Sequence, residues 1–217
     1  MKPPHVAIGR LARSSVSGMR TAATLPSVAM AGHELHELPP DLPVPEDDGA
    51  ARHLGGVEVP SVTLCSTNGE HSDLAVASEG TLVVYVYPKT GIPGQPLPAG
   101  WDRIPGARGC TPQSCAFRDS VRELGDLEAT VLGLSAQSLD EQREFAERER
   151  IPYPLLNDSE FQLAEGVSLG LPTFTADGTR FYRRLTFVAQ RRRIAKVFYP
   201  VFPPQENAAD VIAWLNS

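Results

Sequence analysis

The chain has 217 residues, of which 41% are apolar and 21% charged, and its net charge is −6. This length suffices for one domain with a full core, and the composition is that of an ordinary globular protein. The negative charge argues against nucleic acid as the main partner. No apolar run approaches the ~20 residues of a membrane span, and three cysteines are too few for a secreted disulfide scaffold.

The first quarter of the chain lacks the pattern of a packed core. Residues 1–33 carry four basic residues and no acidic one. This composition resembles a mitochondrial transit peptide and also fits a disordered extension, which we favour. Residues 39–49 are typical of an acidic, proline-rich linker. We therefore expect residues 1–54 to be disordered or extended, residues 55–217 to form the domain, and the protein to be cytoplasmic, with a mitochondrial location as the alternative.

Beyond residue 55, the hydrophobic pattern alternates between strands and helices. Continuous apolar runs, as in strands buried on both faces, lie between segments whose apolar residues recur at helical spacing. Helices that alternate with buried strands imply parallel pairs, and a late hairpin adds antiparallel ones. The order predicts an α/β protein of the thioredoxin-like fold, with a mixed central sheet and helices on both faces. The expected strands are 57–64, 82–87, 130–135, 153–157, 184–189 and 193–199, and the expected helices are 111–124, 137–150, 159–166 and 207–215.

Two of the three cysteines lie where a loop rich in glycine and proline meets a predicted helix. Thr111 is a suitable N-cap with Pro112 at the first helical position, so Cys110 lies at the helix start. Unpaired backbone N–H groups and the positive end of the helix dipole favour a thiolate there. Cys115, on the same helix, is placed to trap the oxidised form of the first cysteine. The pattern indicates a thiol enzyme resolved by a disulfide, although Cys115 also fits an inert, buried helix cysteine.

The histidines weigh against two other cysteine chemistries, because all five lie in the first third of the chain. A structural zinc site needs four ligands, usually Cys and His, and a Cys-His hydrolase needs a histidine base beside its nucleophile. We therefore expect no metal and no cofactor, with an arginine or the helix end supplying the charge that activates Cys110. Cys65, at the end of a predicted strand, is expected in the core.

Three segments carry a resemblance to a known family. They are Tyr87-Pro88-Lys89 after a hydrophobic strand, the segment 105–119 with its Cys-Thr, second Cys and Phe-Arg-Asp, and Arg184-Leu185-Thr186-Phe187. Together they resemble the peroxiredoxins of the AhpC/TSA (redoxin) superfamily over residues 56–216. Within that superfamily, they are most similar to the peroxiredoxin Q type, also called bacterioferritin comigratory protein.

The resemblance implies an atypical 2-Cys peroxiredoxin, a thiol-dependent peroxidase that needs no cofactor. Cys110 would be the peroxidatic cysteine, Cys115 the resolving cysteine that forms an intramolecular disulfide with it, and Arg184 the arginine that supports thiolate and peroxide. Hydrogen peroxide and organic hydroperoxides would be the substrates, a thioredoxin-like protein the reductant, and the chain a monomer or homodimer. A surface position without a role stays open for Arg184.

Two features depart from the family pattern. Ala107 stands where the family has a Thr or Ser whose hydroxyl orients the peroxide, and the loop before Cys110 is longer than in the family. We expect Thr111 or Thr90 to supply a hydroxyl, with backbone N–H groups alone as the alternative. Trp101 in the long loop would cover the pocket, contact a partner or anchor the loop. Two other functions stay open: a redox-sensing or regulatory binding protein, in which Ala107 marks lost turnover, and a thiol–disulfide oxidoreductase.

The spacing of the two cysteines also sets a mechanical condition. In an intact helix, residues five apart have Cα atoms roughly 8–9 Å apart, whereas a disulfide needs about 7 Å or less. The first turns must therefore unwind before the two sulfurs can bond. Gly106, Gly109 and Pro112 make this end easy to open.

Overall fold

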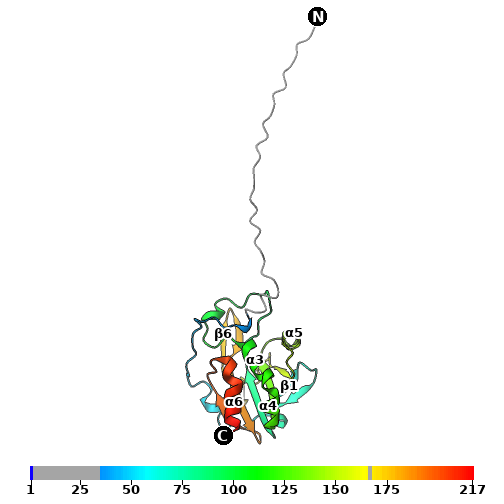
Figure 1. Ribbon diagram of the computed structural model, residues 1–217, viewed down its shortest axis with the longest axis vertical. Coiled ribbons are helices and arrows are strands. Elements are labelled where there is room, and N and C mark those ends of the chain that lie inside the picture. Colours follow the sequence, from blue (N-terminus) through cyan, green and yellow to red (C-terminus); the bar gives the residue numbers. More distant parts are fainter. Residues whose placement is uncertain (2–34, 166–167) are drawn as a thin grey trace.

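The structure is a computed structural model that describes residues 1, 35–165 and 168–217 (Figure 1). The expectations for residues 2–33 lie outside this part of the chain. No helix among the described residues is long and apolar enough to cross a membrane. The strands are β1 (Thr63–Ser66), β2 (His71–Asp73), β3 (Thr81–Val86), β4 (Ala129–Ser135), β5 (Leu155–Asn157), β6 (Thr173–Ala176), β7 (Thr179–Tyr182), β8 (Leu185–Gln190) and β9 (Arg193–Phe198). The helices are α2 (Leu74–Ala77), α3 (Cys110–Asp119), α4 (Val121–Asp126), α5 (Leu139–Glu149) and α6 (Asn207–Leu215), with 3₁₀ turns η1 (Arg52–Leu54), η2 (Trp101–Arg103) and η3 (Pro204–Glu206).

Within the described residues, seven strands form one mixed sheet in the order β2-β1-β5-β4-β3-β8-β9. β3 pairs in parallel with β4, and β4 with β5, because a helical crossover connects each pair. β8 runs antiparallel to β3, and β9 antiparallel to β8. Every residue of β3 after Thr81 is buried, as its continuous apolar sequence predicts. The expected mixed sheet of an α/β protein is confirmed.

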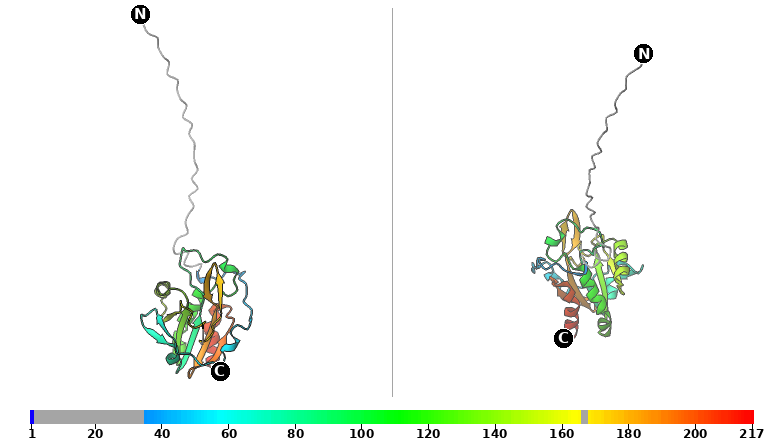
Figure 2. Two further views of the ribbon diagram at one scale, coloured as in Figure 1. Left: turned by 180° about the vertical axis from the view of Figure 1, so that it is seen from behind. Right: turned by 45° about the horizontal axis from the view of Figure 1, so that its top comes forward.

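Helices cover the two faces of the sheet unequally. α3, α4, α5 and α6 lie on one face, where Phe117, Phe145 and Val211 pack on the buried strands. The ring of Phe117 stacks on Tyr85 of β3 with centroids 4.7 Å apart. The opposite face is covered by η1, the one-turn α2 and the segment after β5, which bury Leu54 and other leucines. The view from behind in Figure 2 shows the strands in front of the longer helices.

Two expected helices differ in the structure. The helix expected at 111–124 is two helices, α3 and α4, which meet at Ser120. Ser120 leaves the helical backbone (φ −98°, ψ 1°), and its N–H donates to the carbonyls of Ala116 and Arg118. At 159–165, turns replace the expected helix. There the Asp158 carboxylate accepts the backbone N–H groups of residues 162 and 163, so a side chain substitutes for the backbone bonds of a helix.

Residues near the expected domain boundary are also placed differently. Ala51 and Leu54 are buried in the core, so residues 51–54 pack as part of the domain, although the sequence assigned them to an extended segment. The strand expected at 57–64 is largely outside the sheet, and only β1 begins within it, at Thr63. Val59 instead donates its N–H to the carbonyl of Arg192 at the β8–β9 turn. The hairpin of β6 and β7 was not expected from the sequence.

Candidate active site

Cys110 is the first residue of α3 and is only 3% exposed. Gly109 precedes it as the N-cap, with a left-handed backbone (φ 98°) that favours glycine. A Cβ atom on Gly109 would lie 2.3 Å from Cγ of Pro204 in η3, so the turn before the cysteine can be packed this closely only by glycine. The expected N-cap, Thr111, is instead inside the helix. The helix starts earlier because Gly109 supplies the turn.

Arg184, the residue before β8, reaches the sulfur of Cys110. Its Nη2 lies 3.1 Å from Sγ, so a guanidinium N–H donates to the sulfur. Burying a charge is costly unless its donors are paired. Nε donates to the Gly106 carbonyl at 3.2 Å, and Nη2 also lies 3.3 Å and 2.9 Å from the carbonyls of Ala107 and Arg108. Arg184 is therefore a buried residue that fixes the loop before the cysteine, which excludes a surface strand position.

Three further polar residues orient this arginine. Gln113, three residues after the cysteine, accepts from Nη1 of Arg184 through its Oε1 and donates from Nε2 to Asn207 Oδ1 at 3.0 Å. The same oxygen of Asn207, at the start of α6, accepts from the Thr186 hydroxyl at 2.6 Å. Sequence reasoning missed all three residues. The signal for Gln113 was a polar residue on the buried side of the helix, but nothing local pointed to Asn207.

The two threonines considered as hydroxyl donors occupy different environments. Thr90 donates its hydroxyl to Gln137 Oε1 at 3.0 Å, and its backbone N–H meets the same oxygen at 2.7 Å. Its hydroxyl is therefore engaged in fixing the loop. Thr111 lines the small hollow in front of Cys110, where a peroxide oxygen would be placed. Ala107, also in this wall, contributes a carbonyl oxygen 3.6 Å from Sγ.

Cys115 lies on α3 in a separate, buried environment, and it forms no disulfide with Cys110 in this structure. Its Sγ is 3.8 Å from Oε2 of Glu149, the last residue of α5. Burial raises the pKa of the Cys115 thiol to about 11; Arg118 opposes this shift and Glu149 adds to it. His36 Nε2 lies 3.1 Å from the same carboxylate oxygen.

Within the described residues, a group of side chains able to ligate a metal ion has its ligand atoms within 4.8 Å of one another. The group consists of His36, Cys115 and Glu149. The sequence argument against zinc relied on the distance of the histidines from the cysteines along the chain, and the tertiary structure removes that distance for His36. A structural zinc site needs four protein ligands, and these three side chains are one too few. Cys65 was expected in the core; it is exposed, with Sγ 3.1 Å from His71 Nε2.

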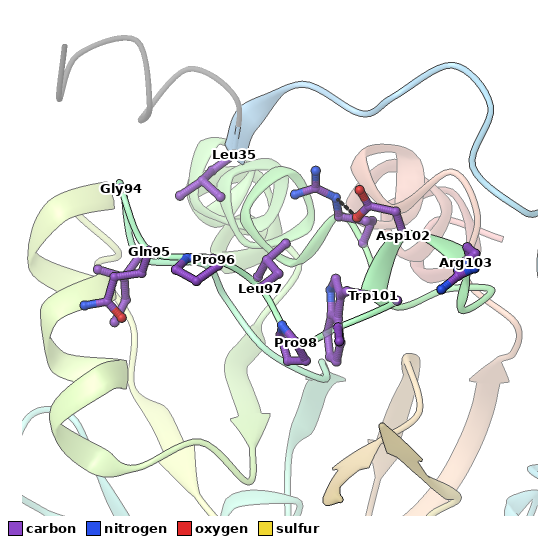
Figure 3. A pocket seen from close by; sticks show the side chains of 13 residues that line it. Leu35, Gly94, Gln95, Pro96, Leu97, Pro98, Trp101, Asp102 and Arg103 are labelled. Atoms are coloured by element: carbon purple, nitrogen blue, oxygen red, sulfur yellow. Dashed lines mark ion pairs between the residues drawn. The ribbon is translucent and has the colours of Figure 1, made fainter. Parts of the chain in front are cut away.

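The long loop between β3 and α3 forms a cavity of about 670 Å³ (Figure 3). Its wall contains Leu35, Leu97, Trp101 and the ion pair of Arg108 with Asp102, whose Nε and Oδ1 atoms are 2.7 Å apart. Leu35, Leu97, Trp101 and Arg108 also line the hollow of about 20 Å³ at Cys110. The cavity thus adjoins the sulfur.

Trp101 anchors this loop to the β6–β7 hairpin. Its ring meets Phe181 edge-on with centroids 4.9 Å apart and is tilted against Phe174 at 5.9 Å. The indole is buried, and it lines both the cavity and the hollow. Of the roles expected from the sequence, anchoring the loop and covering the pocket are therefore combined in one side chain.

Comparisons with known proteins show which family the chain resembles. The profile of the AhpC/TSA family matches residues 104–197. Over this range the chain is similar to the peroxiredoxins of this family. Peroxiredoxin Bcp from Bacillus subtilis is 32% identical over 110 residues, which cover 51% of this chain and 60% of the relative. The chloroplastic Peroxiredoxin Q of Suaeda salsa is 26% identical over 159 residues, which cover 73% of this chain and 65% of the relative. Each match thus spans less than two thirds of the relative.

The fold of this chain is that of a solved structure. Peroxidoxin BcpB from Mycobacterium tuberculosis superimposes with a TM-score of 0.60 at 28% identity, covering 75% of this chain and 96% of the other. The thioredoxin-like fold expected from the sequence is thereby confirmed. The range matched by the family profile contains Cys110, Thr111, Cys115 and Arg184. The wall of the large cavity is built mostly from residues before that range.

Proposed function

We propose that this chain is a peroxiredoxin, a thiol-dependent peroxidase that reduces hydrogen peroxide and organic hydroperoxides. The observation that carries the proposal is the 3.1 Å contact between Arg184 Nη2 and Cys110 Sγ at the start of α3. The cation favours the thiolate, which attacks one peroxide oxygen. The O–O bond breaks, a sulfenic acid forms on Cys110, and the other oxygen leaves as water or alcohol. Arg184 donors stabilise the charge that develops on this oxygen.

Cys115 completes the proposed cycle as the resolving cysteine. Its thiol attacks the sulfenic acid, an intramolecular disulfide forms, and water leaves. The first turns of α3 must open for this step, because residues five apart on a helix are too far apart to bond. A thioredoxin-like dithiol then reduces the disulfide. A monomeric or homodimeric assembly and a cytoplasmic location stay predictions.

Access to the sulfur supports organic hydroperoxides as substrates. The hollow at Cys110, about 20 Å³, has the size needed by one or two small oxygen groups. The adjoining cavity of about 670 Å³ is in the range of small-molecule sites. The hydroperoxide group would enter the hollow while the organic part stays in the cavity. Thr111, in the hollow wall, is the hydroxyl that we assign to orient the peroxide.

Stopped-flow oxidation with one equivalent of peroxide tests this function. A peroxidase is expected to be oxidised within milliseconds to seconds at micromolar peroxide and to turn over with a thioredoxin system. Slow oxidation without turnover would indicate a redox sensor. Failure to react with peroxide, with rapid reaction towards protein disulfides, would indicate a thiol–disulfide oxidoreductase.

A further inference from the structure

Glu149 connects the buried thiol of Cys115 to a solvent-exposed histidine. Its Oε2 lies 3.8 Å from Cys115 Sγ and 3.1 Å from His36 Nε2. Cys115 and Glu149 are 7% and 8% exposed, whereas the His36 side chain is 42% exposed. The three groups therefore form a line from the protein interior to the surface. His36 belongs to the segment before the domain, which the sequence suggested was extended.

The proposed resolving step needs such a connection. A thiol attacks poorly until it loses its proton, and burial with a neighbouring carboxylate raises the pKa of Cys115 to about 11. At neutral pH almost none of it is thiolate. A proton acceptor in contact with the sulfur is therefore required for fast attack on the sulfenic acid.

We propose that Glu149 is the general base that takes the proton from Cys115 and that His36 passes this proton to solvent. The proposal rests on the peroxidase function above. As the proton leaves, the Cys115 sulfur bonds to the Cys110 sulfur and the S–O bond of the sulfenic acid breaks. The departing hydroxide takes a proton and becomes water. One sulfenic acid and one thiol thus give one disulfide and one water, with no further oxidant or reductant.

Neighbouring contacts hold the acceptor in place during this step. Arg148 Nε contacts the other carboxylate oxygen of Glu149 at 3.0 Å, which leaves Oε2 directed towards Cys115 and His36. Arg118 Nη1 donates to the backbone carbonyl of Glu149 at 2.7 Å, so the last turn of α3 is tied to the end of α5. The first turn of α3 can open while Cys115 stays beside its base.

The remaining ionisable groups around Cys115 do not replace this acceptor. Arg118, on the same helix, is a cation and lowers the thiol pKa, whereas the negative charge of Asp119 raises it. Tyr85 of β3 and Tyr153 also interact electrostatically with the thiol. Burial raises the pKa of both phenols, so they stay protonated and cannot accept its proton. Among the described groups, Glu149 is the carboxylate in contact with the sulfur.

Two-phase stopped-flow kinetics after one equivalent of peroxide tests the proposal, with EDTA present to remove any metal. The first phase reports oxidation of Cys110 and the second reports disulfide formation. At pH 7, Glu149→Gln should slow the second phase roughly 100-fold, the order supplied by a general base. This deficit should shrink towards pH 11, where the thiol ionises unaided. Glu147→Gln, exposed on the same helix, is the matched control and should match the wild type.

His36→Gln supplies a second variant at an exposed position. It should slow the second phase several-fold at pH 7, and millimolar imidazole should restore the rate by carrying the proton. Equal second-phase rates for wild type and Glu149→Gln would overturn the proposal. So would a deficit that is constant with pH, because that marks a structural role. If the wild type lacks the first phase, the proposed peroxidase function is wrong and this inference is wrong with it. If the first phase is normal but the second phase does not depend on Glu149, only this inference is wrong.

Discussion

Arg184 and Cys110 are 74 positions apart in the sequence, yet the guanidinium nitrogen and the sulfur are 3.1 Å apart. The register of β3 and β8 explains this contact. Val86, the last residue of β3, pairs with Leu185, the first of β8. Arg184 therefore lies beside the end of β3, where the chain leaves the sheet on its way to Cys110. The sheet brings the cation to the helix start.

Arg184→Lys should slow the oxidation of Cys110 more than a conservative substitution normally would. A lysine ammonium cannot donate at once to the sulfur, to Gln113 and to three backbone carbonyls, because it lacks the planar fork. We expect the rate of Cys110 oxidation to fall by one to two orders of magnitude, about 1.4–2.7 kcal/mol of transition-state stabilisation. Arg183→Lys is the control, since Arg183 is half exposed and pairs with Asp48. Equal stopped-flow rates for Arg184→Lys and wild type would remove Arg184 from the chemistry.

Replacing each cysteine separately should divide the cycle into its steps. Cys110→Ser should abolish peroxide consumption, because an alcohol does not ionise near neutral pH. Cys115→Ser should keep the first oxidation but accumulate sulfenic and then sulfinic acid. Mass spectrometry after one and after several equivalents of peroxide distinguishes these products. Wild-type turnover by Cys110→Ser would contradict the proposed function.

Gly109→Ala should destabilise the protein and disturb the site together. A Cβ there would strain a left-handed backbone and meet Pro204 of η3 at 2.3 Å. The strain alone should cost roughly 1–2 kcal/mol, measured as a lower free energy of unfolding in urea, and Cys110 oxidation should slow. Gly125→Ala is the matched control. No atom lies within 4 Å of its added Cβ, so this helical site should gain about 0.5–1 kcal/mol.

The two threonine variants should separate a binding role from a structural one. Thr111→Val removes the hydroxyl from the hollow at Cys110 and should slow peroxide reduction about tenfold or more. Thr90→Val removes a buried hydrogen bond to Gln137 and should lower stability by about 1 kcal/mol with little change in rate. The checks are stopped-flow kinetics and urea unfolding. Wild-type rates in both variants would leave the orienting role to backbone N–H groups.

Filling the large cavity should discriminate between substrates by size. Ala99 lies in its wall and is exposed, so Ala99→Trp adds bulk without entering the core. We expect kcat/KM for cumene hydroperoxide to fall at least about fivefold, roughly 1 kcal/mol, while kcat/KM for hydrogen peroxide stays constant. Ala195→Trp, on an exposed position of β9, is the control. A parallel fall for both peroxides would exclude the cavity as the site of the organic group.

Much of the fold could be predicted because its signals are local. The apolar run of β3 and the helical spacing of α5 and α6 appear within a few turns of chain, and the structure has these elements within two residues of their expected bounds. The exceptions have local competitors. Asp158 binds backbone N–H groups that a helix would have used, and Ser120 divides the helix after Cys110. Helix propensity and hydrophobic periodicity, from which helices are predicted, take no account of such side-chain contacts.

The sequence by itself determined the position of Cys110 at a helix start and the resemblance to the family, and it predicted this cysteine as the reactive one, because these depend on residues close together in the chain. Only the tertiary structure decided which distant groups surround the two sulfurs. Strand register brings Arg184 to Cys110, the docking of α6 brings Asn207 to Gln113, and the segment before the domain brings His36 to Glu149 beside Cys115. Such contacts arise from packing across the whole fold, and no local pattern records the pairing of residues far apart in sequence.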